Sequence, residues 1–242
     1  MAHVRSDREA RDELTAISAL GEPSRRALYD YIVDAADWVS RDQAADAVGL
    51  ERAAVAHHLD RLAADGLLEV DFQRLTGRQG PGAGRPAKLY RRARRDFELS
   101  LPPRDYALAG QMLAEAAERA RTGRKDIVTA LDEVATDKGE GVADKINARL
   151  GARGGRRSAA SKRKVVLDVL EEEGYEPQAR RDGTIVLRNC PFHRLAQQHT
   201  ELICGMNQCL LSAAVDAVDG AGLEARLEPE EGLCCVKLHP AR

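Results

Sequence analysis

The spacing of glycines and apolar residues between Ser40 and Gly66 limits the fold of this chain more than any other feature. Ser40 is a typical helix N-cap, and Gly49 ends the short helix predicted over residues 42–48. A second helix is predicted over residues 51–64. Its core-facing stripe consists of Val55, Leu59 and Leu62. A short helix, a tight turn and an amphipathic helix together predict a helix-turn-helix.

A β-hairpin is predicted directly after these helices. Residues 67–72 alternate between apolar and polar as in a strand, residues 76–86 are rich in Gly and Pro, and residues 87–91 read as the return strand. A hairpin with a long tip in this place is a wing. From Phe72 to Arg95 the chain is rich in arginine and has no acidic residue, which suits contact with phosphates or a narrow minor groove.

The segment HHLDRLAADGLLEV, followed by GRPAKLYRRA, resembles the winged helix of the ArsR-like bacterial repressors over about residues 12–92. The resemblance implies that the partner is double-stranded operator DNA. The predicted DNA-contacting residues are Arg52, Ala53, Ala54, His57, His58, Arg74, Arg78, Arg85 and Lys88. A second interpretation is that His57 and His58 are surface or packing residues and that the wing arginines only confer solubility. The helix-turn-helix prediction is the same under either interpretation.

Two long helices are predicted in the middle of the chain, over residues 105–121 and 125–150. In this class such helices pair two subunits, and a homodimer would place two recognition helices about one DNA turn apart. The alternative is a helical spacer packed within one subunit. A polar, glycine-rich linker is predicted next. The predicted fold is therefore α+β, with a winged helix-turn-helix (1–100), dimerisation helices (101–150), a flexible linker (151–162) and a C-terminal α/β sensor domain (163–242).

All five cysteines lie in the last quarter of the chain. The N-terminus has no apolar stretch typical of a signal peptide, and no apolar run has the length of a membrane span, so we expect a cytoplasmic protein without membrane contact. An odd number of thiols in a reducing compartment argues against a disulfide framework. Clustered thiols there indicate metal binding or redox chemistry.

The predicted order of elements lets distant cysteines meet. A helix is predicted over residues 164–173, a strand over 184–188, a mostly helical stretch over 192–218, and strands over 223–227 and 234–238. The cysteines fall at the junctions of these elements. Thiolates select zinc, copper(I) or iron–sulfur clusters. Zinc sites usually show close cysteine pairs, whereas the wide spacing here, and a proline directly after Cys190, favour a cluster.

The segments Asn189-Cys190-Pro191-Phe192-His193, Cys204-Gly205-Met206-Asn207 and Cys234-Cys235-Val236 resemble the sensor domain of the suf-operon repressor family. The resemblance implies an iron–sulfur cluster, with the 4Fe-4S type favoured over 2Fe-2S, and repression of the genes for cluster assembly. The implied metal ligands are Cys190, Cys204, Cys234 and Cys235. The family has a single last ligand, so the two adjacent cysteines here compete for that position.

Strand alternation favours Cys234 as the inward ligand, because it would share a face with Val236 and Leu238. Candidates for a fourth ligand are His193, His199, Cys209, a small exogenous thiol or water. Cys209 also reads as a small buried hydrophobe, and the two histidines as solvent-facing residues.

Two other functional classes stay open at this point. One is a winged-helix regulator that binds zinc or senses oxidants through its thiols. The other is a cysteine-dependent enzyme, which we do not predict because no oxyanion loop, phosphate loop or paired carboxylates accompany the cysteines.

Overall fold

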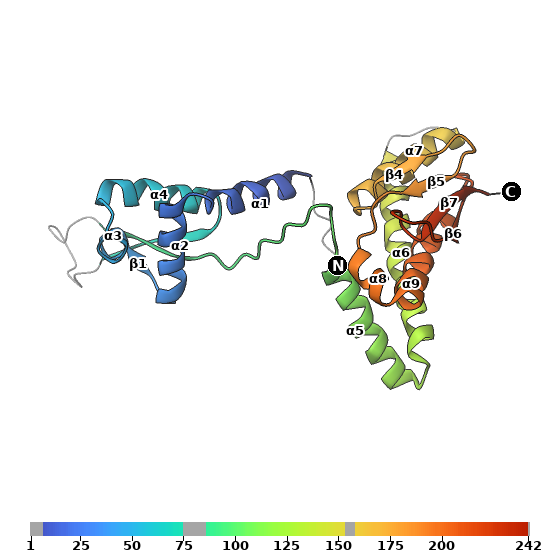
Figure 1. The fold of residues 1–242 in the computed structure, drawn as a ribbon, viewed down its shortest axis with the longest axis horizontal. Coiled ribbons are helices and arrows are strands. Elements are labelled where there is room, and N and C mark those ends of the chain that lie inside the picture. Colours follow the sequence, from blue (N-terminus) through green and yellow to red (C-terminus); the bar gives the residue numbers. More distant parts are fainter. Residues whose placement is uncertain (1–6, 75–85, 153–157, 242) are drawn as a thin grey trace. The chain divides into compact units, whose positions relative to one another are not determined.

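The structure is a computed structural model that describes residues 7–74, 86–152 and 158–241. The chain forms two compact units, one made by Arg5–Leu99 and the other mainly by Ser100–Arg242. Each unit combines helices with one small antiparallel sheet, so the predicted α+β class is confirmed (Figure 1). No helix in the described ranges is both long and apolar enough to cross a membrane.

The first unit contains four helices and three strands within its described residues. These are α1 Asp7–Ala19, α2 Pro23–Ala35, β1 Val39–Ser40, α3 Arg41–Val48, α4 Arg52–Ala64, β2 Leu68–Gln73 and β3 Ala87–Arg92. The sheet order is β1-β3-β2, and β2 pairs with β3 in an antiparallel register that sets Val70 opposite Tyr90. The tip of the predicted hairpin, with Arg78 and Arg85, lies outside the described residues.

Capping fixes the boundaries of α3. The Ser40 side chain accepts from the Gln43 backbone N–H, and the Gln43 side chain accepts from the Ser40 backbone N–H, which is a complete capping box. At the other end Gly49 has a φ of 70°, a left-handed conformation that glycine adopts without steric cost. The predicted tight turn into α4 is therefore confirmed.

The buried stripe of α4 packs on α2 to form the core of this unit. Val55, Leu59 and Leu62 are fully buried, as their spacing predicts, together with Leu28 and Ile32 of α2. The stripe covers one face of α4 only, so the opposite face of that helix stays exposed.

The second unit holds five helices and four strands within its described residues. These are α5 Tyr106–Gly123, α6 Ile127–Ala152, α7 Ala159–Glu172, β4 Pro177–Ala179, β5 Ile185–Leu187, α8 His193–Gln198, α9 Thr200–Asp216, β6 Leu223–Leu227 and β7 Val236–Pro240. The sheet order is β4-β5-β7-β6. One core joins α5 and α6 to α7, α9 and this sheet. The pairing of two subunits through these helices stays a prediction.

Two sequence-based boundaries differ from the structure. The last strand begins at Val236 rather than Cys234. The Cys234 N–H donates to the Leu187 carbonyl of β5, and the Cys235 carbonyl accepts from the N–H of Glu228, the residue after β6. The alternation argument for Cys234 therefore does not apply. The residues expected to form a linker are helical at both ends, since α6 reaches Ala152 and α7 begins at Ala159.

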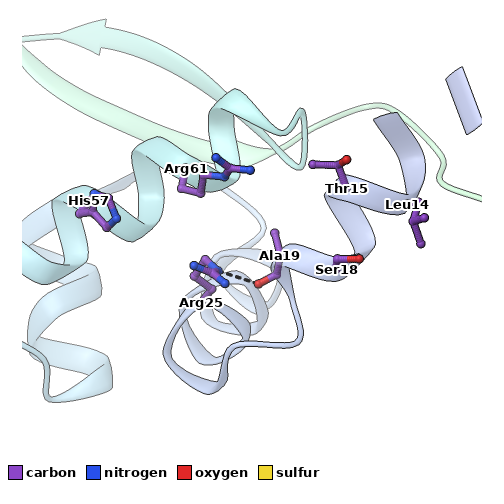
Figure 2. Close-up of a pocket in the computed structure, with 7 residues that line it drawn as sticks. All are labelled: Leu14, Thr15, Ser18, Ala19, Arg25, His57 and Arg61. Carbon is purple, nitrogen blue, oxygen red and sulfur yellow. Dashed lines mark hydrogen bonds between the residues drawn. The ribbon is translucent and has the colours of Figure 1, made fainter. Parts of the chain in front are cut away.

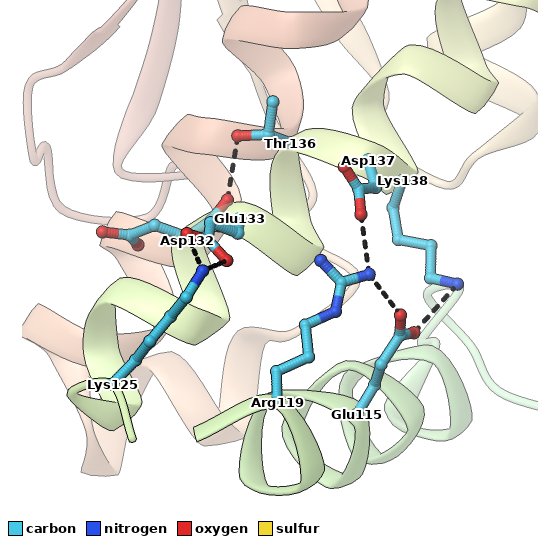
Figure 3. Close-up of polar contacts among 8 residues, drawn as sticks. All are labelled: Glu115, Arg119, Lys125, Asp132, Glu133, Thr136, Asp137 and Lys138. Carbon is cyan, nitrogen blue, oxygen red and sulfur yellow. Dashed lines mark hydrogen bonds and ion pairs between the residues drawn. The ribbon is translucent and has the colours of Figure 1, made fainter. Parts of the chain in front are cut away.

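Helix α6 is held between two neighbours. Figure 3 shows its polar contacts with α5, where Arg119 donates to Asp137 at 2.7 Å and Lys138 lies 3.5 Å from Glu115. On its buried side α6 packs against α9. A Cβ at Gly139 would collide with the Leu210 carbonyl oxygen and would lie 2.7 Å from the Ala213 Cβ. Only glycine allows the two helices to come this close.

We expect Gly139→Ala to lower the free energy of unfolding of this unit by about 2–4 kcal/mol, because overpacking forces a helix backbone to move. Gly141→Ala is the matched control: the added Cβ meets nothing within 4 Å, and alanine there should stabilise α6 by about 0.5–1 kcal/mol. Chemical denaturation followed by circular dichroism measures both. Equal effects of the two substitutions would contradict the close packing of α6 on α9.

Candidate functional site

The exposed face of α4 is the first candidate surface. Its solvent-facing residues include Arg52, Ala53 and His57, whereas Ala54 is half-buried. Arg52 Nε lies 2.6 Å from Asp42 Oδ1, and both side chains remain largely exposed. The small Ala53 side chain lies on this surface near Arg52 and His57, which carry groups that can donate hydrogen bonds.

His58 and Lys88 are turned toward the protein. His58 Nδ1 lies 3.7 Å from Glu22 Oε2 of the residue that caps α2, and the His58 side chain is 19% exposed. Lys88 Nζ donates to Asp60 at 2.6 Å. Their principal contacts are therefore internal, whereas Arg74 is exposed at the end of β2.

Asp60 joins three elements, and its role was not predicted from the sequence. Its carboxylate accepts from Arg41 of α3 at 2.7 and 2.8 Å, and from Lys88 and the Tyr90 hydroxyl of β3 at 2.6 Å. Burial opposes ionisation, but these hydrogen bonds outweigh it and lower the pKa of Asp60 to about 2. The ionised Asp60 thus fixes α4 against α3 and the hairpin.

The second candidate site lies in the other unit, where four cysteines meet. Cys190 follows β5, Cys204 is on α9, and Cys234 and Cys235 precede β7. Cys204 Sγ is 2.7 Å from Cys235 Sγ, and Cys190 is hydrogen-bonded to Cys234. Cys190, Cys204 and Cys234 are buried, and Cys235 is half-buried. Four cysteines, the outermost of which are 45 positions apart in sequence, thereby form one thiol cluster.

The loop that carries Cys190 is held by Asn189 and Arg104. Asn189 Nδ2 donates to the carbonyls of Pro103 at 2.8 Å and Gly174 at 2.6 Å, and the Asn189 side chain also accepts from Arg104. Arg104 donates to the Cys190 carbonyl at 3.0 Å. A cation and a buried amide therefore fix the position of this cysteine.

The electrostatics of the cluster favour one thiolate at Cys190. The hydrogen bond from Cys234 lowers the pKa of Cys190, against the effect of burial, and a Phe192 backbone N–H and the Arg104 charge act in the same direction. The pKa of Cys234 is correspondingly raised. Burial and the adjacent Cys235 raise the pKa of Cys204 to about 12.

A buried polar pair reaches the cluster from one side. The Tyr175 hydroxyl donates to Asn207 Oδ1 at 2.5 Å, and Asn207 Nδ2 donates to Cys234 Sγ at 3.3 Å. Both side chains are about 2% exposed. The sequence signal for Asn207 was a polar residue on the apolar face of α9, three residues after Cys204. The amide of Asn207 thus gives the buried Cys234 sulfur a hydrogen-bond donor and links it to Tyr175.

The three candidates for an additional ligand lie elsewhere. The Cys209 thiol lies beside Asp132 of α6, and burial, followed by that carboxylate, raises the pKa of Cys209 to about 11. His193 and His199 are exposed at the two ends of α8.

The four thiols differ in geometry from a preformed metal site. Within the described ranges, no group of three or more His, Cys, Asp or Glu side chains is arranged so that it could hold a metal ion. Tetrahedral Zn–S bonds of about 2.3 Å set ligand sulfurs about 3.8 Å apart. The 2.7 Å between Cys204 and Cys235 is shorter, so this pair has to separate before both sulfurs bind one metal group. In kind, number and burial, however, four thiols fit an iron–sulfur cluster.

Comparisons with protein-family models, with characterised proteins and with solved structures gave no match.

We expect Asp60→Asn to lower the free energy of unfolding by about 1 kcal/mol, since solvent screens a side chain that is 45% exposed. The lowered pKa means that Asp60 stabilises the fold above its unfolded pKa near 4, and that this contribution is lost as pH falls through about 2. The Asp60→Asn variant should therefore lose less stability than the wild type as the pH falls from about 4 to about 2. Asp46→Asn, at an exposed position of α3, is the control. Identical acid titrations of the wild type and both variants would refute the role of Asp60.

Proposed function

We propose that this protein is a DNA-binding transcriptional regulator that senses iron–sulfur status through a cluster held by its C-terminal cysteines. The observation that carries the proposal is the meeting of Cys190, Cys204, Cys234 and Cys235 from three separate segments. The same chain has a helix, a glycine turn, a second helix and an antiparallel hairpin in its first unit, which is the element order of a winged helix-turn-helix.

In this proposal α4 is the recognition helix. Arg52 and His57 are on its exposed face and offer donors to base edges, and the small Ala53 side chain permits close approach to the DNA. Arg74 at the end of β2 would contact phosphate. The partner is double-stranded operator DNA, read by a homodimer with two copies of α4.

The cluster would be held by Cys190, Cys204, Cys234 and Cys235. When bound, it supplies one-electron redox chemistry and sensitivity to oxidants. Arg104 and the Phe192 backbone N–H favour the thiolate form of Cys190, and Asn207 donates to Cys234. Burial of three of these cysteines excludes bulk water from the site.

Regulation follows if cluster-bound and cluster-free protein differ in affinity for operator DNA. We propose that the cluster-bound form holds the operator and that loss of the cluster releases it. Repression of the genes for cluster assembly is the part of this proposal that depends on the resemblance to the suf-operon repressors.

A second candidate function is direct thiol redox sensing. The Cys204 and Cys235 sulfurs are 2.7 Å apart, and their two thiols need only lose two electrons and two protons to an oxidant such as a peroxide to form a disulfide. A zinc-binding regulator would use the same thiols and would be colourless.

We expect anaerobically reconstituted protein to bind iron and sulfide and to absorb broadly near about 400 nm, because iron–sulfur clusters are held by thiolates. Serine at position 190, 204, 234 or 235 should remove most of this absorption and most of the iron. Cys209→Ser is the matched control, since Cys209 lies beside Asp132 rather than in the cluster of thiols, and it should bind iron like the wild type.

Protein that stays colourless and iron-free would refute the cluster. A Cys204–Cys235 disulfide detected by mass spectrometry after peroxide treatment of that protein would support the second candidate. Bound zinc in its place would support the zinc-binding alternative.

We expect Ala53→Glu to weaken binding to operator DNA more than tenfold, because a carboxylate on the exposed face of α4 would be repelled by phosphates. Ala35→Glu makes the same charge change at the exposed end of α2 and should bind within about twofold of the wild type. Fluorescence anisotropy with operator selected from a random duplex library measures both. Equal affinities would show that α4 does not face the DNA.

A further inference from the structure

A groove in the first unit lies between α1, α2 and α4. It has a volume of about 570 Å³. Its lining residues are Leu14, Thr15, Ser18, Ala19, Arg25, His57 and Arg61. Figure 2 shows His57 and Arg61 along α4, Thr15 and Ser18 on α1, and Arg25 at the start of α2. Three helices thus bring polar side chains to one place on the surface.

The lining has the chemistry of an anion site. It contains two guanidiniums, an imidazole and two hydroxyls, and none of the lining residues is acidic. Charge-assisted hydrogen bonds from arginine are the usual means by which proteins hold phosphate. Leu14 is the one large apolar side chain in the lining, and it is 47% exposed.

Both guanidiniums are anchored by their inner nitrogen. Arg25 Nε donates to the Ala19 carbonyl at 2.7 Å (Figure 2), and Arg61 Nε donates to Asp65 at 2.8 Å. The Arg61 side chain is 53% exposed, whereas the Asp65 side chain is only 8% exposed. Anchoring at Nε fixes the plane of each guanidinium, so less rotamer entropy is lost when an anion binds.

The Glu22 carboxylate beside Arg25 also caps α2. Glu22 lies 3.9 Å from Arg25 Nε, but its two oxygens accept from the backbone N–H groups of Ser24 and Arg25. Glu22 therefore acts mainly as the N-cap of α2. Glu22 and Asp65 keep their negative charges beside Arg25 and Arg61. Anion binding here would therefore depend on the guanidinium N–H groups other than Nε–H, not on a net positive charge.

The groove continues the exposed stripe of α4. Ala53, His57 and Arg61 follow one another at intervals of four residues and lie on one side of the helix. At 1.5 Å per residue, Arg61 is about 12 Å further along the helix than Ala53. This length matches the width of the major groove, about 12 Å, so a helix with Ala53 at the base edges brings Arg61 to the flanking phosphates.

We propose that this groove binds a phosphate of the DNA backbone, with Arg25 and Arg61 as the charged contacts and Thr15 and Ser18 as further hydrogen-bonding partners, while His57 keeps the role at the base edges. The inference rests on the proposed DNA-binding function and adds residues that the sequence did not single out. A protein partner is the less favoured occupant, because the lining offers a single large apolar side chain for burial.

The experiment measures the salt dependence of binding to a labelled duplex of random sequence, by anisotropy with the full-length protein. Each lost phosphate contact reduces the slope of log K against log salt by about 0.9. We expect Arg25→Gln/Arg61→Gln to reduce the slope of log K against log salt by about 0.9 to 1.8 and to weaken binding at low salt at least tenfold. Arg25→Lys/Arg61→Lys, which keeps both charges, should recover most of the slope.

Arg26→Gln is the matched control. Arg26 is the neighbour of Arg25 on α2, is largely exposed and lies 3.7 Å from Asp30, outside the groove. It should leave the slope unchanged. Circular dichroism and thermal melting establish that each variant is folded. A variant that is only less stable, but still folded, should bind DNA with the same slope of log K against log salt as the wild type.

An unchanged slope in the folded double glutamine variant, with wild-type DNA binding intact, overturns the groove and leaves the proposed function standing. An equal loss of slope in Arg26→Gln also overturns it, because the effect would then follow net charge. A change in oligomeric state by light scattering with an unchanged slope would assign the groove to a protein contact. Wild-type protein that binds no duplex at low salt overturns both this inference and the proposed DNA-binding function.

Discussion

The close approach of α6 and α9 is the constraint on which the second unit depends. Glycine at position 139 lets the α9 backbone lie against α6, since any Cβ there would collide with the Leu210 carbonyl. Because α9 carries both Cys204 and Asn207, this packing also sets where the thiol cluster forms. A site that needs several sulfurs in one place therefore depends on a residue that contributes no side chain.

A charge has the corresponding role in the first unit. Asp60 holds Arg41, Lys88 and Tyr90, and these partners come from α3 and β3. The orientation of α4 is thus fixed by its buried apolar stripe and by the contacts of Asp60, and the remaining face of the helix stays exposed. The candidate DNA surface and the groove proposed to bind a phosphate meet on that outer face, at His57.

Elements with strong local signals were predicted well. Helices α3 and α4 agree with prediction to within one residue at each end, because a capping box, a left-handed glycine and a regular apolar stripe fix them locally. Strands β1 and β4 were missed because runs of two and three residues show no periodicity. The start of β7 was placed two residues too early, since apolar composition does not reveal which strand a backbone group bonds to.

By itself the sequence determined the α+β class, the helix–turn–helix–hairpin order and the set of cysteines that can act together. These features depend on local spacing and on residue chemistry. Only the tertiary structure decided that Cys204 pairs with Cys235 and Cys190 with Cys234, that Lys88 is engaged by Asp60, and that Arg25 and Arg61 share a groove. Each of these contacts joins residues far apart along the chain, and the packing of helices and strands around a core determines which of them meet.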